Sequence, residues 1–314
     1  MRLARWLLAA ALGGAATLAH ASTRPAWAAD ARTATIAVAE GPDRVARMAV
    51  TWFLPSGPGP FPVVVFSHGR DPSAAGRAGL VLGVSESQVL FWLSRGVAVV
   101  SPLRPGYGSS TGGDVEGAGV AIDRTGRCIG HADFRKTADA AVRSIEATLQ
   151  WLRARSWADN RAVLLVGQSV GGLATVAAEA QGLAGVVGYV NFAGGTGGNP
   201  ERAPGAPCDP GQLEALYADY GRTTTVPNLW VYALNDQYWG PAVPREWHAA
   251  FAHGGSPTTF VEEPPVAGGD GHGLSRHAPA LWSPAVDGLL ARLGFPWNAA
   301  RTPHPVLRLD PGGT

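Results

Sequence analysis

Short, continuous apolar runs recur along this chain and alternate with longer segments in which apolar residues return every three to four positions. Several of the runs are rich in valine and leucine, as in strands that are buried on both faces of a sheet. The runs predict strands at residues 62–66, 97–100, 162–166, 186–192, 229–233 and 258–262. The segments with helical spacing predict helices at residues 85–94, 131–155, 170–181, 244–253 and 278–293.

Two further strands with partial polar–apolar alternation are predicted near the N-terminus, at residues 33–40 and 45–54, joined by a short turn. Strands that alternate with helices indicate a mostly parallel central sheet with helices on both faces. The fold class is therefore α/β. A length of 314 residues suits one such domain, and the sequence contains no internal repeat, coiled coil or sign of a second domain.

The N-terminal segment has the three parts of a secretory signal peptide. Two arginines among the first five residues precede an apolar stretch at residues 6–18, and Ala19-His20-Ala21 is a small-x-small cleavage site. Residues 26–28 form a second candidate site. An uncleaved membrane anchor is the alternative, but the apolar stretch is short for a bilayer span. We therefore expect residues 1–21 to be removed and residues 22–314 to be exported, to the periplasm or outside the cell.

The two cysteines of the chain, Cys128 and Cys208, lie in predicted loops rich in glycine and proline. Export would bring them into an oxidising compartment, so we expect one disulfide between them. The alternative is two unrelated buried thiols. Neither cysteine is placed as a catalytic nucleophile would be.

The charge balance excludes some classes of partner. The formal net charge is +1 and the pI is about 7.9, and the arginines are scattered along the chain. A protein that binds nucleic acid or an anionic membrane through its charge shows a basic block or face. We therefore expect no nucleic-acid partner and no stable membrane insertion once the signal is removed, while the oligomeric state stays open.

A Gly-x-Ser-x-Gly motif at residues 167–171 joins the predicted strand at residues 162–166 to a helix. In this setting it predicts a nucleophile elbow, a tight turn that holds the Ser169 hydroxyl above the edge of the sheet. With 42 glycines in the chain, the motif would arise by chance about 0.3 times. A glycine-rich turn without chemistry is therefore the alternative, and the surrounding pattern must decide.

Other polar features also follow predicted strands, where the carboxyl ends of parallel strands converge and sites form. Ser169 needs a base to take its proton, and His272 lies in a glycine-rich loop that follows the last strand. Asp236 directly follows an apolar strand and would fix the tautomer of the imidazole and stabilise the imidazolium. The sequence therefore predicts a catalytic triad of Ser169, Asp236 and His272.

Several neighbours compete for these roles. The open alternatives are His248, His253 and His277 for the base and Asp219 and Asp270 for the acid. A metal site built from Asp270, His272 and His277 is disfavoured, because no further ligands follow at regular spacing. We expect no metal and no cofactor.

Five segments together are more specific than any one of them. They are VFSHGR at residues 65–70, RPGYGSS at 104–110, GQSVG at 167–171, ND at 235–236 and GHG at 271–273. With these segments the chain resembles the α/β-hydrolases, and within them the dienelactone-hydrolase-like group, over nearly everything after the signal segment. The chain order Ser, Asp, His is the order of that fold.

The resemblance implies two donors for an oxyanion hole, the backbone N–H groups of Arg70 and Val170. It also reveals a departure, because the dienelactone hydrolases proper use a cysteine nucleophile where this chain has Ser169. The serine puts a dienelactone substrate in doubt and favours a general serine esterase.

Three aromatic residues are candidates to bind substrate. Tyr107 would line the acyl pocket, and Tyr238 and Trp239 would wall the site just past the acid, with simple packing as the alternative for each. His68 ends a strand and is expected to bind backbone near the oxyanion turn. The side chain of Arg70 would meet either an acidic substrate or solvent.

These residues predict hydrolysis of a small-molecule acyl ester through an acyl-enzyme intermediate on Ser169. Esters are the expected substrates because alkoxides leave readily. Two other functions stay open, a peptidase or amidase on the same fold and a catalytically silent binding protein.

Overall fold

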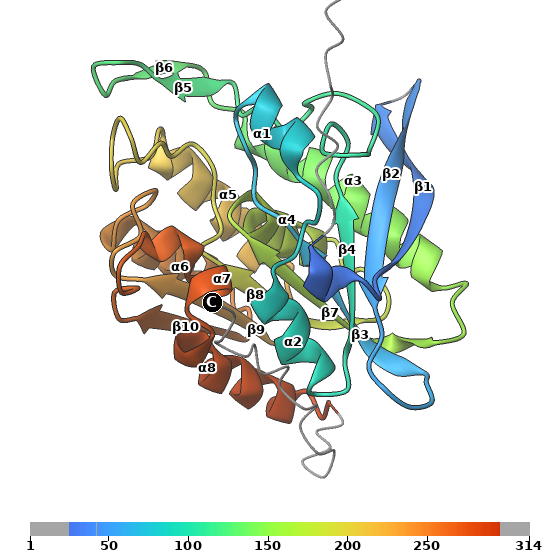
Figure 1. The fold of residues 1–314 in the computed structure, drawn as a ribbon. Coiled ribbons are helices and arrows are strands. Elements are labelled where there is room, and N and C mark those ends of the chain that lie inside the picture. The colour runs from blue at the N-terminus through green and yellow to red at the C-terminus, as the bar shows by residue number, and fades with distance from the viewer. Residues whose placement is uncertain (1–24, 42, 296–314) are drawn as a thin grey trace, which may run out of the picture.

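The computed structural model describes residues 25–41 and 43–295, so the predicted signal peptide lies outside the described residues. An eight-stranded sheet crosses the molecule in the order β1-β2-β4-β3-β7-β8-β9-β10 (Figure 1). Its strands are β1 (Arg32–Gly41), β2 (Arg44–Phe53), β3 (Phe61–Ser67), β4 (Ala98–Leu103), β7 (Ala158–Gln168), β8 (Val186–Phe192), β9 (Asn228–Ala233) and β10 (Thr258–Glu263).

The six strands from β4 to β10 in this order pair in parallel, whereas β2 runs antiparallel to β4 and β1 antiparallel to β2. The predicted mostly parallel sheet is therefore confirmed. Every predicted strand is present, with bounds that differ by a few residues. Parallel strands place their carboxyl ends at one edge, and this edge collects the polar features that the sequence singles out.

Helices cover both faces of the sheet (Figure 1). On one face α3 (Phe134–Leu152) and α4 (Val170–Glu179) pack on each other, and α5 (Pro210–Gly221) contacts both; α6 (Ala242–His253) packs on α5. On the opposite face α2 (Glu86–Leu93) packs against α8 (Pro279–Arg292). None of the helices in the described residues is both long and apolar enough to cross a bilayer.

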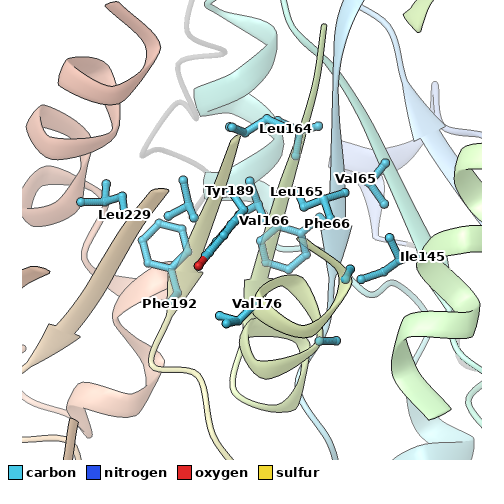
Figure 2. Close-up of a cluster of buried hydrophobic side chains, with 14 of the residues drawn as sticks. Val65, Phe66, Ile145, Leu164, Leu165, Val166, Val176, Tyr189, Phe192 and Leu229 are labelled. Atoms are coloured by element: carbon cyan, nitrogen blue, oxygen red, sulfur yellow. The ribbon is translucent and has the colours of Figure 1, made fainter. Parts of the chain in front are cut away.

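The apolar core lies on both faces of the sheet, under α3 and α4 on one face and under α2 and α8 on the other. All residues of β3 and β4 are buried, as the continuous apolar runs predict. Figure 2 shows how side chains of neighbouring central strands meet those of the two helices. The labelled residues are Val65, Phe66, Leu164, Leu165, Val166, Tyr189, Phe192 and Leu229 from strands and Ile145 and Val176 from helices.

Some elements carry no sequence prediction. They are the short helices α1 (Ala74–Gly79) and α7 (Leu274–His277), helix α5, the 3-10 turns Ala26–Ala28 and Gly271–Gly273, and a hairpin of β5 (Val120–Ile122) and β6 (Cys128–Gly130). The hairpin extends away from the body at the upper left of Figure 1. Its strands are short and mostly exposed, so they have no apolar pattern to detect.

The predicted disulfide is present. Cys128 of β6 and Cys208, just before α5, are bonded, with their Cα atoms 5.5 Å apart. The bond ties the β5–β6 hairpin to the segment between β8 and α5.

Candidate active site

Ser169 sits at the sharp turn between β7 and α4. Its backbone has φ 58° and ψ −124°, a conformation that residues with a side chain rarely adopt. The neighbours must be small: a Cβ on Gly167 would lie 2.0 Å from the carbonyl oxygen of Gly171, and a Cβ on Gly171 would lie 2.0 Å from that of Ser67. The Gly-x-Ser-x-Gly motif therefore does form a strained strand-to-helix elbow.

Asp236 and His272 come together from the ends of β9 and of the loop after β10. The Nδ1 atom of His272 lies 3.0 Å from Oδ2 of Asp236, and the Asp236 side chain has no exposed surface. The other carboxylate oxygen, Oδ1, accepts the backbone N–H groups of Tyr238 and Trp239 at 2.8 and 3.2 Å. A carboxylate accepts only, so Nδ1 carries the proton and the neutral ring keeps Nε2 as an acceptor.

Two aromatic rings hold the imidazole in place. The ring of Tyr238 stacks on that of His272 at 3.9 Å between centroids, and Trp239 meets it edge-on at 5.4 Å. Tyr238 also lines the cavity beside the histidine. Trp239 does not: it is 1% exposed, donates its indole N–H to the carbonyl of Ala193 and lies behind the imidazole. For Trp239 the structure thus shows the alternative of simple packing, because the contact with the histidine buries the ring.

The loop of His272 is fixed through its backbone. Oδ1 of Asp270 accepts the N–H groups of His272 and Gln237 at 2.9 and 2.8 Å. Gln168, beside the nucleophile, donates its side-chain N–H to the carbonyl of His272 at 3.0 Å. This second contact ties the histidine loop directly to the elbow, and the sequence motif gives no sign of it because its second position accepts any residue.

The alternative acids have other partners. Asp270 binds backbone N–H groups and not an imidazole. Asp219, on α5, forms exposed ion pairs with Arg135 and Arg222. Asp236 is thus the carboxylate that meets a histidine ring.

The alternative bases are placed less well than His272. His248 bonds Thr258 at 3.0 Å, and burial lowers its pKa to about 4. His253 lies at the C-terminal end of α6. His277 does line the same cavity as Ser169, but within the described residues it has no carboxylate on its ring. In residues 25–41 and 43–295 no three His, Cys, Asp or Glu side chains gather as a metal site would require.

One cavity of about 740 Å³ brings the predicted residues to a common space. Ser169 and His272 both line it, and Arg70, Tyr107 and Tyr238 are among the other lining residues. Tyr107 is nevertheless 1% exposed, and its hydroxyl donates to the carboxylate of Glu116 at 3.3 Å. Tyr107 therefore lines the cavity but is also packed into the surrounding structure.

The two predicted oxyanion donors flank the serine. A Cβ on Gly69 would lie 3.3 Å from the Cβ of Ser169, so the turn that carries the Arg70 amide runs directly beside the nucleophile. Val170 is the first residue of α4, where backbone N–H groups have no partner within the helix. Within the described part of the chain, neither amide has a protein acceptor. Both are available to a developing negative charge.

The side chain of Arg70 is held at the rim of the cavity. Its Nη2 lies 2.6 Å from Oδ2 of Asp114, which also pairs with Arg77 at 3.2 Å. The side chain of Arg70 is 20% exposed. The Arg70 side chain therefore does not extend freely into solvent, which was one of the two positions predicted for it.

His68 has the backbone contacts that its position at the end of β3 predicts. Its Nδ1 donates to the carbonyl of Gly69 at 2.7 Å, and its Nε2 accepts the N–H of Arg104 at 3.2 Å. Burial, aided by the charge of Arg104, holds the pKa of His68 well below its usual range. A neutral ring with both nitrogens engaged in this way supports the turn and is not available as a base.

Sequence reasoning missed two residues behind this turn. Arg104 and Glu116 are fully buried and paired with each other, and Arg104 also bonds the carbonyls of His68 and Gly69. Arg104 lies in the 104–110 segment that carries the family resemblance, whereas Glu116 lies in irregular sequence where nothing marks it.

Compared with known proteins, the chain matches no family model and no curated protein. Its fold does resemble solved structures. The esterase Pf2001 of Pyrococcus furiosus is 13% identical, with a TM-score of 0.56 over 83% of this chain and 90% of that one. A putative dienelactone hydrolase from Klebsiella pneumoniae is 15% identical, with a TM-score of 0.51 over 84% and 98%.

A puromycin-hydrolyzing peptidase of Mycobacterium tuberculosis is 20% identical, with a TM-score of 0.52 over 86% of this chain but only 40% of its own. At such low identities the likeness concerns the fold. The architecture that the sequence resemblance implies is confirmed: the chain has the α/β-hydrolase fold.

Proposed function

We propose that this chain of α/β-hydrolase fold is a serine hydrolase that cleaves carboxylic esters through an acyl-enzyme intermediate. The observation that carries the proposal is the buried Asp236–His272 pair, at 3.0 Å, whose histidine lines one cavity with the strained Ser169 elbow. An elbow alone is a turn. An elbow that shares a cavity with an imidazole whose tautomer a buried carboxylate fixes has the parts of acyl transfer.

The first half-reaction uses the free imidazole nitrogen. Nε2 of His272 takes the proton of Ser169 as the serine oxygen attacks the ester carbonyl, and Asp236 stabilises the imidazolium that forms. The N–H groups of Arg70 and Val170 donate to the oxyanion. The same Nε2 then protonates the departing alcohol, leaving the acyl group on Ser169.

The second half-reaction repeats these roles with water. His272 takes a proton from a water molecule, which attacks the acyl carbonyl; the oxyanion forms between the same two amides. Collapse of the tetrahedral intermediate returns the proton to Ser169 and releases the acid. No step requires a cofactor.

A graded panel of p-nitrophenyl acyl esters, run beside aminoacyl p-nitroanilides, tests the substrate class. We expect ester hydrolysis that Ser169→Ala abolishes. The matched control is Ser56→Ala, in the turn before β3 at the opposite edge of the sheet, which should keep wild-type rates. Preference for the anilides would instead favour a peptidase, the activity named for one neighbour. Failure of a fluorophosphonate probe to label Ser169 would point to a catalytically silent binding protein.

We further propose that the protein is exported. The Cys128–Cys208 disulfide supports this, because such bonds persist in oxidising compartments, and the signal-like pattern at residues 1–21 supports it independently. Intact-mass analysis of the mature protein should show an N-terminus after residue 21, or after residue 28 if the second site is used. Recovery of an uncleaved chain from the cytoplasm would contradict export.

A further inference from the structure

A buried guanidinium stands behind the oxyanion turn. Arg104 is 0% exposed, and all five of its N–H groups have acceptors. Two go to the carboxylate of Glu116, so the ion pair is bidentate. The other three go to the hydroxyl of Ser67 and to the carbonyl oxygens of His68 and Gly69. Arg104 therefore binds the backbone of the turn as well as the side chain of Glu116.

The Gly69 carbonyl is the important contact. It accepts Nη2 of Arg104 at 3.2 Å and Nδ1 of His68 at 2.7 Å, so two donors fix its direction. The peptide bond from Gly69 to Arg70 is trans and planar, which means that its C=O and N–H point in opposite directions. Because the Gly69 oxygen is held toward Arg104, the Arg70 N–H points away from Arg104. This N–H belongs to the turn after β3, which runs beside Ser169.

The charge of Arg104 also acts on this peptide unit. A cation at the carbonyl oxygen polarises the amide and makes its N–H a stronger donor, because hydrogen bonds in a chain reinforce one another. Lysine cannot reproduce the arrangement, since an ammonium has three donors and no planar fork.

Glu116 offsets the cost of burying the charge of Arg104 and fixes the plane of its guanidinium group. An unpaired guanidinium in the interior would be costly, and the carboxylate, itself 2% exposed, balances it. The backbone of Glu116 is held in turn, because its carbonyl accepts the hydroxyl of Thr137 on α3 at 3.1 Å. The hydroxyl of Tyr107 adds a further donor to the carboxylate. The contacts of Arg104 with the turn are thus connected through Glu116 to helix α3.

We propose that Arg104, oriented by Glu116, is a positioning residue that aims and polarises the Arg70 N–H of the oxyanion hole. The inference rests on the proposed serine hydrolase function. It assigns a role in the reaction to two residues that touch no substrate: they set the position of a donor that the transition state needs more than the bound ester does.

The test compares Arg104→Lys and Glu116→Gln with matched changes in an exposed ion pair, Arg245→Lys and Glu262→Gln. Active serines are titrated with a fluorophosphonate, and kcat is expressed per titrated serine. We expect kcat of both buried variants to fall about 10- to 100-fold, less than or comparable to loss of a whole oxyanion donor. KM should change less than about threefold. Affinity for a boronic acid that forms a tetrahedral adduct should fall in parallel with kcat.

A purely structural role gives a different result. It would lower the melting temperature and the fraction of titratable serines but leave kcat per titrated serine and boronic acid affinity at wild-type values, and that outcome overturns the proposal. Should Arg104→Lys fail to fold, Glu116→Gln decides, because it keeps the volume of the side chain. A wild-type protein that neither hydrolyses esters nor reacts at Ser169 would refute the proposed function itself.

Discussion

Replacing Asp236 with asparagine tests the proposed tautomer of His272. Oδ1 of Asp236 accepts two backbone N–H groups, from Tyr238 and Trp239, so the amide oxygen of an asparagine must occupy that place. The amide NH₂ is then forced to the position of Oδ2, 3.0 Å from Nδ1 of His272. Facing a donor, Nδ1 must become the acceptor, and the ring proton moves to Nε2.

An imidazole protonated at Nε2 cannot take the proton of Ser169. Loss of the correct tautomer in a serine–histidine–aspartate site lowers kcat by about 10⁴-fold, equivalent to roughly 5 kcal/mol in the activation free energy. We expect Asp236→Asn to show a loss of this size with an unchanged melting temperature, because the amide fits the same space and keeps the two backbone bonds.

The control is the same substitution two residues before the histidine. Asp270 uses one oxygen to accept the N–H groups of His272 and Gln237, a role that an amide oxygen also fills. Asp270→Asn should therefore lose less than about tenfold in kcat. Steady-state kinetics on one p-nitrophenyl ester compare the two variants. Equal effects in both, or a loss below about 100-fold in Asp236→Asn, would refute the assignment of Asp236 as the triad acid.

Three other outcomes follow from buried or bridging groups. Burial raises the pKa of Glu179 to about 8 from 4.5, so the folded chain holds a proton that the unfolded chain releases, and stability falls as pH rises between these values. Urea unfolding should show Glu179→Gln matching wild type near pH 4.5 but up to about 3 kcal/mol more stable at pH 7, at about 1.4 kcal/mol per pH unit; a difference independent of pH would contradict this. Replacing Cys128 and Cys208 with alanine opens a link across 80 residues and should cost about 2–5 kcal/mol in the same assay, whereas an unchanged midpoint would mean that the link contributes nothing. Gln168→Ala removes the bond to the carbonyl of His272 and should lower kcat about tenfold with KM nearly constant, and a full wild-type kcat would show that this bond does not position the histidine.

The strands could be predicted because strands buried on both faces leave an unbroken apolar run, and β3 is such a run. Helix α5 was missed although its buried residues Leu213, Leu216, Tyr217 and Tyr220 have helical spacing. The glycine- and proline-rich sequence before it hides the start of the helix. The β5–β6 hairpin offered no signal, since its residues are largely exposed.

The proximity of Asp236 and His272 could be predicted because both residues follow parallel strands. The carboxyl ends of such strands lie at one edge of the sheet, independently of the conformation of the loops. Distance along the sequence could not decide between Asp236 and Asp270 as the acid. Asp270 is nearer to His272 in sequence, but its carboxylate accepts backbone N–H groups and does not contact the imidazole. The Arg104–Glu116 pair was beyond prediction: it joins two irregular segments, where no periodicity says which side chains turn inward.

A crystal structure of the fluorophosphonate-treated protein tests the central claim most directly. The account predicts phosphorus bonded to Oγ of Ser169, with the phosphoryl oxygen within about 3 Å of the backbone nitrogens of both Arg70 and Val170. Nε2 of His272 should lie within hydrogen-bond distance of an adduct oxygen. An adduct on another residue, or a phosphoryl oxygen that points to solvent with both amides unoccupied, would contradict it.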